Sequence, residues 1–150
     1  MTAPDRFFVF DLDGTLANVD HRQEHALNKD WDTFHSLAYL DQPYTNIVEL
    51  FSTIPEDWTI IIITGRDEKH RQMTEEWLDE HNIYPDEVFM RPEGNHRPDH
   101  EYKLSVIDTY CGSREKALAS VIAWFEDRDN LVEKLRDAGF TILQVKAGAY

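Results

Sequence analysis

Residues 7–16 have the sequence FFVFDLDGTL, the most informative stretch of this chain. Its first four residues form an apolar run that ends abruptly at a carboxylate, which is typical of a buried strand. Two carboxylates, Asp11 and Asp13, follow with one leucine between them. Carboxylates this close repel each other unless a cation intervenes, and Mg²⁺ prefers oxygen ligands. The stretch therefore predicts a strand whose polar end carries a reactive carboxylate and a metal ion.

Alternating apolar runs and amphipathic patterns predict an α/β fold. The expected strands cover residues 7–10, 58–63, 87–90, 121–125 and 141–145. The expected helices cover residues 45–52, 69–81, 102–110 and 131–138. This order predicts a parallel sheet with helices on both faces. Ligands bind at the carboxyl ends of such strands, so Asp11, Thr64 and Asp127 should converge at one edge.

Length and composition indicate one globular domain over residues 1–150, with residues 17–44 as a small helical insertion after the first strand. The net charge of −14 argues against a basic protein that coats nucleic acid. A single cysteine, Cys111, excludes an intramolecular disulfide framework. No run is apolar over the length of a membrane span, and the start does not resemble a secretion signal. We therefore expect a cytoplasmic protein.

Four motifs resemble those of the haloacid dehalogenase (HAD) phosphatase superfamily. FDLDGTLA at residues 10–17 resembles the first motif, and ITGR at residues 63–66 resembles the second. Lys103 is the candidate for the third, and FEDR at residues 125–128 resembles the fourth. The resemblance covers residues 6–148. It implies a Rossmann-like fold in which residues 17–44 form a small helical cap.

A narrower resemblance is to the 3′-phosphatase domain of phage-type polynucleotide kinase-phosphatases. That domain has an arginine eleven residues after its first aspartate, as Arg22 is here, and a Gly-Arg pair after the second strand. It also has Arg-x-Asp ahead of the motif-three lysine, which Arg97 and Asp99 match here. It ends in Gln-Val-x-x-Gly-x-aromatic, which residues 144–150 match. The sequence has no GxxxxGK[ST] motif, which excludes ATP-driven 5′-phosphorylation by this chain.

The resemblance implies chemistry through an aspartyl-phosphate. Asp11 is the expected nucleophile and Asp13 the general acid and base, while Thr64 and Lys103 hold phosphoryl oxygens. Mg²⁺ is the expected cofactor, bound by Asp11, the carbonyl of Asp13 and Asp127, and Mn²⁺ or Co²⁺ would suit the same ligands. Glu126 is the alternative ligand, because the phage-type domain has Asp-Asp where this chain has Glu-Asp. The expected substrate-binding residues are Arg22, Gly65, Arg66 and Arg97.

The predicted activity is Mg²⁺-dependent removal of a 3′-phosphate from nucleic-acid ends, with a separate kinase or ligase as a partner. One alternative is a phosphatase of free nucleotides or another small phosphomonoester. A second is a non-catalytic binding module of the same fold, against which the complete motif set argues.

Several residues outside the motifs have a structural and a functional interpretation. The aromatic residues of the insertion either stack on a nucleobase or pack on the core: Trp31, Phe34, Tyr39 and Tyr44. Its histidines are expected on solvated helix faces: His21, His25 and His35. We also expect Asp67 and Asp99 to cap helices.

Overall fold

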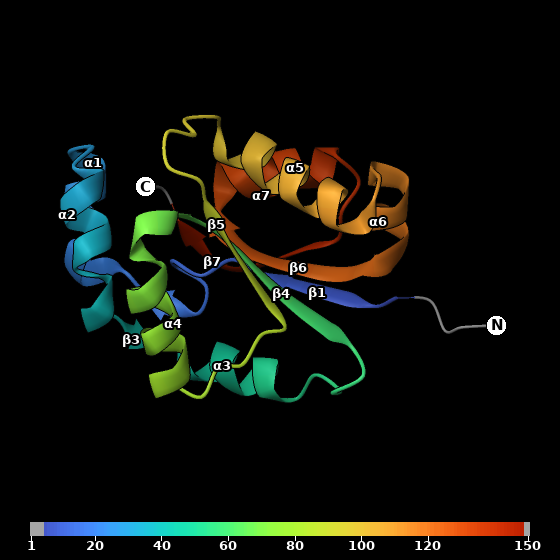
Figure 1. Ribbon diagram of the computed structural model, residues 1–150, viewed down its shortest axis with the longest axis horizontal. Helices are drawn as coiled ribbons and strands as arrows, with labels where there is room; N and C mark the ends of the chain where they lie inside the picture. The colour runs from blue at the N-terminus through green and yellow to red at the C-terminus, as the bar shows by residue number, and fades with distance from the viewer. Residues whose placement is uncertain (1–4, 149–150) are drawn as a thin grey trace.

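The structure is a computed structural model that describes residues 5–148 (Figure 1). Five parallel strands form one sheet in the order β5-β4-β1-β6-β7, which confirms the predicted parallel sheet. The strands are β1 (Phe7–Phe10), β4 (Thr59–Asp67), β5 (Glu87–Arg91), β6 (Val121–Arg128) and β7 (Ile142–Gly148). Strand β1 therefore lies in the middle of the sheet, and Asp11 follows directly from it.

Helices cover both faces of the sheet, as predicted. Helices α3 (Thr45–Ser52) and α4 (Arg71–Glu80) lie on one face, and α5 (Asp99–Cys111), α6 (Arg114–Ser120) and α7 (Asp129–Asp137) lie on the other (Figure 1). Successive side chains of a strand point to opposite faces, so Val9 belongs to the core on the α5 side and Phe10 to the core on the α3 side.

The polar end of β1 is fixed to its neighbour β6. The Phe10 and Phe125 rings stack with centroids 4.4 Å apart. The backbone N–H of Asp11 then donates to the Phe125 carbonyl oxygen at 2.9 Å. Asp11 is therefore held in place by the sheet itself.

The insertion after β1 stands at the carboxyl end of the sheet (Figure 1). Two short antiparallel strands, β2 (Ala17–Asn18) and β3 (Gln42–Pro43), pair at its base. Between them lie 3₁₀ turns at Asp20–Arg22 and Ala38–Leu40 and helices α1 (Gln23–Leu27) and α2 (Trp31–Ser36). Val19, Ala26 and Phe34 form its own small core. The predicted helical insertion is confirmed, but strands of two residues are too short to leave a sequence pattern.

Strands β4 and β6 run further than predicted. The apolar runs end at Ile63 and Phe125, yet backbone pairing continues through irregular steps to Asp67 and Arg128. The motif residues that follow each run therefore lie inside strands. Helix α6 was not predicted, because its seven residues, REKALAS, are too few to repeat an amphipathic pattern.

The two predicted helix caps have different outcomes. The Asp67 side chain accepts a hydrogen bond from the Lys69 N–H at 2.9 Å in the 3₁₀ turn Glu68–His70, which confirms that cap. The Asp99 cap was wrong, because Pro98 occupies the N-cap of α5 and the Asp99 carboxylate binds two arginines instead.

Within residues 5–148, no helix combines the length and the apolar character needed to cross a bilayer. The last two residues of the predicted terminal motif, Ala149 and Tyr150, lie outside the described residues.

Candidate active site

The structure brings the predicted motif residues to one edge of the sheet. A cavity of about 730 Å³ opens there, a volume in the range of small-molecule sites. The predicted site residues that line it are Asp11, Asp13, Thr64, Gly65, Arg97 and Lys103. Residues from strands far apart in the sequence therefore meet, as the carboxyl ends of parallel strands require.

The turn after β1 presents the two aspartates through its apolar neighbours. Leu12 and Leu16 are fully buried and anchor the turn on the core. Gly14 has φ of 83°, in the left-handed region that a glycine adopts without strain, and its N–H donates to the Ala17 carbonyl oxygen at 2.8 Å. The leucines hold the turn in place while Asp11 and Asp13 line the cavity.

Asp11, Glu126 and Asp127 form what we term the acidic cluster. Each offers a carboxylate oxygen, these oxygens lie within 4.8 Å of one another, and all three residues are buried. Lys103 Nζ donates to Asp11 Oδ1 at 2.7 Å and to Glu126 Oε1 at 2.6 Å. Lys103 therefore bonds to two of the three carboxyl groups of the cluster.

The electrostatics of the acidic cluster reflect this excess of carboxylates. Burial and the nearby Asp11 raise the pKa of Glu126 to about 8, although Lys103 opposes the shift. Burial lowers the pKa of Lys103, but Asp11 and Glu126 outweigh it and hold that pKa above its usual value.

The donor set of the acidic cluster fits a divalent cation. Glu126 Oε2 is buried and has no hydrogen-bond partner among the described residues. Buried carboxylates that lack partners are costly, and hard cations such as Mg²⁺ bind carboxylate oxygens. A metal ion at this position would satisfy both the excess charge and the unbonded oxygen.

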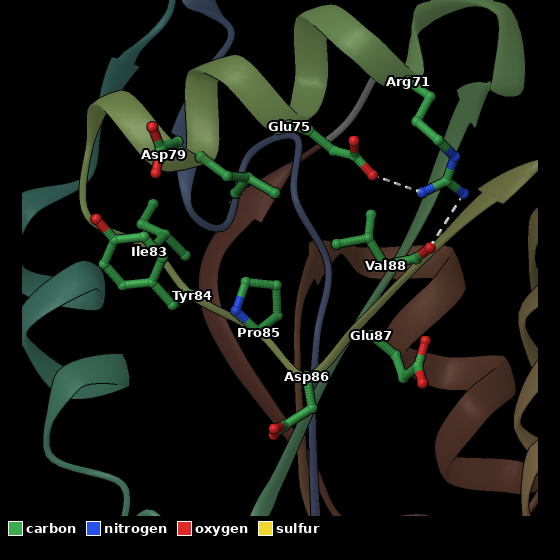
Figure 2. Close-up of a pocket in the computed structure, with 10 residues that line it drawn as sticks. Arg71, Glu75, Asp79, Ile83, Tyr84, Pro85, Asp86, Glu87 and Val88 are labelled. Carbon is green, nitrogen blue, oxygen red and sulfur yellow. Dashed lines mark hydrogen bonds and ion pairs between the residues drawn. The ribbon is translucent and has the colours of Figure 1, made fainter.

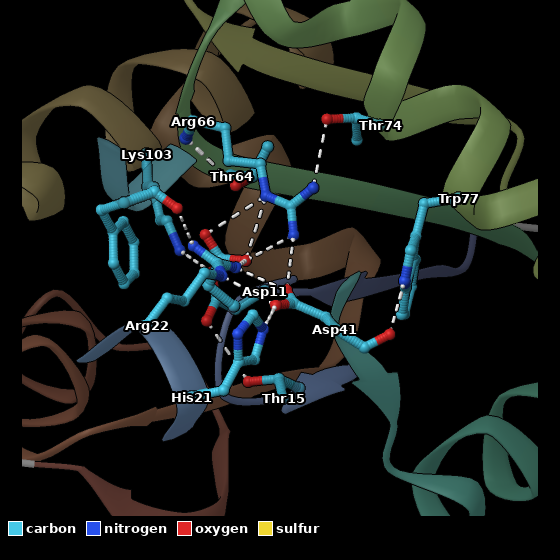
Figure 3. A network of polar contacts seen from close by, with 12 residues as sticks. Asp11, Thr15, His21, Arg22, Asp41, Thr64, Arg66, Thr74, Trp77 and Lys103 are labelled. Atoms are coloured by element: carbon cyan, nitrogen blue, oxygen red, sulfur yellow. Dashed lines mark hydrogen bonds and ion pairs between the residues drawn. The ribbon is translucent and has the colours of Figure 1, made fainter. Parts of the chain in front are cut away.

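A second group, which we term the arginine cluster, consists of Asp13, Asp41, Arg22 and Arg66. Figure 3 labels Asp41 and the two arginines. Arg22 donates to Asp41 through Nε at 2.7 Å and Nη2 at 2.5 Å, and Nη2 also lies 2.7 Å from Asp13 Oδ1. Arg66 donates to Asp13 Oδ1 through Nη2 at 2.6 Å and Nε at 3.0 Å. Asp41 was missed in the sequence, where no motif surrounds it.

Further contacts fix the arginine cluster between the insertion and the core. Arg22 lies over the Phe34 ring at 4.2 Å, and Arg66 Nη1 donates to Thr74 Oγ1 at 3.2 Å. The Trp77 indole N–H donates to the Asp41 carbonyl oxygen at 2.9 Å. Arg22 and Arg66 are fully buried behind the cavity wall, so their predicted contact with substrate remains a prediction.

The arginine cluster sets the charge of Asp13. Burial alone would raise the pKa of that carboxyl group, but Arg22 and Arg66 outweigh burial and hold the pKa well below its usual range. Asp13 is therefore a carboxylate in the free protein, a state suited to accepting a proton.

Asp99 lines the cavity together with Arg91 and Arg128. Its carboxylate binds both Arg91 and Arg128. A Cβ atom added to Gly65 would lie 3.3 Å from Asp99 Oδ1, so glycine permits the close approach of β4 to α5. Arg97 extends to the rim, where its side chain is 54% exposed and lies 3.5 Å from Glu101.

Two histidines of the insertion make specific contacts: His21 is exposed, as predicted, whereas His35 is half-buried. His21 Nε2 lies 2.7 Å from Asp41 Oδ1, and His35 lines the cavity. Burial lowers the pKa of His35 to about 4, so its imidazole is neutral at pH 7.

A second hollow of about 400 Å³ lies beside α4 and the start of β5 (Figure 2). Arg71 reaches Glu75 and the Val88 carbonyl oxygen there. The other acids that line it are Asp79, Asp86 and Glu87. Since four carboxylates surround one paired arginine, this hollow does not suit a phosphate group.

Comparison with known proteins places the fold and the family. Residues 5–150 match the family model described as the polynucleotide kinase PNKP phosphatase domain. A chain from the Pnkp1/Rnl/Hen1 RNA repair complex is 22% identical with a TM-score of 0.79, and the match covers 100% of this chain and 45% of that one. The chain thus spans about half the length of that relative. The comparison with curated proteins found no match.

More distant structures share the same fold. A haloacid dehalogenase-like hydrolase from Streptococcus pneumoniae is 12% identical with a TM-score of 0.66, covering 94% of this chain and 84% of that one. A HAD-family enzyme from Bacteroides thetaiotaomicron, in complex with magnesium and inorganic phosphate, is 11% identical with a TM-score of 0.59. The match covers 97% of this chain and 96% of that one. The family match and the converging motifs lead to one assignment: the chain belongs to the polynucleotide kinase PNKP phosphatase domains and is a phosphatase of the HAD superfamily.

Proposed function

We propose that this domain is a Mg²⁺-dependent phosphomonoesterase that removes 3′-phosphate from nucleic-acid ends through an aspartyl-phosphate. The observation that carries the proposal is the position of Asp11. Its carboxylate lines the cavity, belongs to the acidic cluster and accepts a hydrogen bond from Lys103 at 2.7 Å. An Asp11 oxygen would attack phosphorus, forming an O–P bond while the bond to the leaving alcohol breaks.

Thr64 and Lys103 would bind phosphoryl oxygens during the transfer, since both line the cavity beside Asp11. Charge spreads over these oxygens in the transition state, so fixed donors there lower the barrier. Arg22, Gly65, Arg66 and Arg97 would complete the substrate contacts. For the two buried arginines this requires the bound phosphate to draw them partly away from their carboxylates.

Asp13 has two roles in this scheme, and its environment favours one of them. As a carboxylate it is ready to take a proton from the water that hydrolyses the aspartyl-phosphate. Donating a proton to the leaving alcohol requires a higher pKa. A bound phosphate that shares Arg22 and Arg66 would weaken their hold on Asp13 and raise its pKa in that step.

Mg²⁺ would be held by Asp11 and Asp127 with the main-chain carbonyl of Asp13, and Glu126 is the alternative carboxylate. When bound, the ion supplies positive charge that lets a phosphate approach the carboxylates. The unbonded Glu126 oxygen supports a cation here, as does the magnesium in the Bacteroides relative.

We further propose that residues 1–150 form one catalytic domain with residues 17–44 as its cap, acting in the cytoplasm beside a separate kinase or ligase. The likeness to a chain of an RNA repair complex supports such a partner. The alternative substrate is a free nucleotide or another small phosphomonoester, which the cavity of about 730 Å³ also favours.

The test is phosphate release with Mg²⁺ from matched substrates: a 3′-phosphorylated oligonucleotide, its 5′-phosphorylated counterpart and a 3′-mononucleotide. Preference for the 3′-oligonucleotide is expected, with Asp11→Asn as the inactive control. Equal or better use of the mononucleotide would move the assignment to free nucleotides. Cleavage of an aryl phosphate alone would leave the chemistry intact but reject a nucleic-acid substrate.

A further inference from the structure

The cavity at Asp11 has two unlike walls above its catalytic floor. Helix α2 of the insertion forms one wall with Trp31, Phe34 and His35. The connection between β5 and α5 forms the other, with Arg97 at its rim. A phosphate bound at the floor leaves the rest of the substrate between these walls.

The α2 wall is aromatic. Trp31 is 47% exposed, which is unusual for so large an apolar side chain. It packs edge-on against Phe34, with ring centroids 5.8 Å apart, and lies within 27° of parallel to His35 at 6.3 Å. Phe34 itself is buried in the small core of the insertion. Trp31 is therefore a supported aromatic ring with open surface.

The same wall carries no uncompensated charge. Burial keeps His35 neutral at pH 7 by lowering its pKa to about 4. Asp32 is paired with Lys69, whose Nζ lies 2.6 Å from Asp32 Oδ1. That pair also joins the insertion to the turn that follows β4. An uncharged aromatic surface favours a flat, apolar ring over a second phosphate.

The opposite wall is charged rather than aromatic. The charged residues that line it are three arginines and two acids: Arg91, Arg97, Arg128, Glu93 and Asp99. Asp99 binds Arg91 and Arg128, and Arg97 reaches the rim with a longer contact to Glu101. Cationic side chains suit the anionic backbone of a polynucleotide. The two walls thus separate the apolar and the anionic parts of one substrate.

We propose that Trp31 is a nucleobase-stacking residue for the nucleotide that carries the phosphate to be removed. This inference rests on the proposed function and adds the means by which the site recognises the terminal nucleoside. Stacking on an aromatic ring accepts every base, because each base has a π face. The domain would therefore require a base at the end that it processes without selecting its identity.

The experiment compares two 3′-phosphorylated oligonucleotides that differ only at the last nucleoside, one with a base and one with an abasic tetrahydrofuran residue. The protein should process the base-bearing end about 5- to 150-fold more efficiently, the range that stacking on an aromatic side chain provides. Trp31→Ala should remove this preference by lowering kcat/KM, chiefly through KM, on the base-bearing substrate alone. Trp31→Phe should restore part of it.

Tyr39→Ala is the matched control, because Tyr39 is an exposed aromatic of the same insertion that does not line the cavity. Its preference should equal that of the wild type. An equal fall on both substrates in Trp31→Ala, or no fall, would overturn the stacking role while leaving the proposed function in place. If the wild-type protein releases phosphate from neither oligonucleotide but cleaves an aryl phosphate, the proposed function fails and the stacking role fails with it.

Discussion

The acidic cluster and the arginine cluster both bury carboxylates at the end of β1, yet they differ in charge balance. The arginine cluster pairs two carboxylates, Asp13 and Asp41, with two guanidinium groups. The acidic cluster brings three carboxyl groups together, and Lys103 bonds to two of them. One group is internally neutral and the other carries excess negative charge.

Because of this difference, the two clusters suit different functions. A buried group whose charges balance holds its geometry without any ligand, so the arginine cluster can orient Asp13 and join the insertion to the core. A buried group with excess charge needs a counterion, so the acidic cluster suits a metal ion and a reactive carboxylate.

Asp11→Asn is expected to have the largest effect. It removes the proposed nucleophile, so phosphate release should fall by more than about 10³-fold. The measurement is steady-state phosphate release with Mg²⁺, with circular dichroism as the check on folding. Substantial remaining activity in a folded variant would show that another group attacks phosphorus.

Asp41→Asn should unbalance the arginine cluster. Removing one partner of a buried ion pair leaves uncompensated charge, which costs about 3–5 kcal/mol of unfolding free energy. Urea unfolding measures the change. Asp137→Asn, at the exposed end of α7, is the matched control and should unfold like the wild type. An Asp41→Asn protein as stable as the wild type would contradict a role of the arginine cluster in stabilising the fold.

Mg²⁺ should stabilise the protein through the acidic cluster. A saturating ion at about 100 times its Kd adds about 2.7 kcal/mol to the unfolding free energy. Thermal unfolding with and without Mg²⁺ measures this gain, which Glu126→Gln and Asp127→Asn should reduce. Asp79→Asn, an acid of the second hollow, should retain it. An equal gain in all variants would place the ion elsewhere.

The pH dependence of stability tests whether His35, which lies near the arginine cluster, stays neutral in the folded protein. Burial is the largest influence on the pKa of His35. Asp13 raises this pKa, whereas Arg66 and Arg22 lower it, and the resulting pKa is about 4. The unfolded chain takes up a proton below pH 6.5 while the folded protein does not, so stability should fall as pH drops from 6.5 to 4.

Urea unfolding at pH 7 and pH 4.5 compares the wild type with His35→Asn. The wild type should lose about 2 to 3 kcal/mol more than the variant between these values. Equal losses would mean that His35 titrates normally and that its surroundings are not apolar and neutral.

Much of the fold and the acidic cluster could be predicted from the sequence. Apolar runs such as residues 60–63 end at polar residues, and parallel strands bring those ends together. Asp11, Thr64 and Asp127 could therefore be assigned to one edge from the strand ends, whereas Lys103 was assigned to the site only by the family resemblance. Their individual roles in catalysis stay predictions until the variants are measured.

The arginine cluster could be predicted only in part. Asp41 is 19 residues from Arg22 and 25 from Arg66, and it belongs to no local pattern. Pairing between isolated charged residues depends on tertiary packing, which periodicity does not encode. The same reason applies to Asp99, whose two arginine partners are 8 and 29 residues away.

The pairing of β2 with β3 has a consequence for how such a domain can diversify. Because Ala17 lies opposite Pro43, the chain leaves and re-enters the core at neighbouring points. Doubling a loop whose ends already meet costs only about 0.6 kcal/mol in closure entropy. Arg22 and Asp41 fix both ends, so residues 23–40 are the segment that can be exchanged. Evolution or design could thus alter which molecules the domain accepts and leave its phosphate chemistry unchanged.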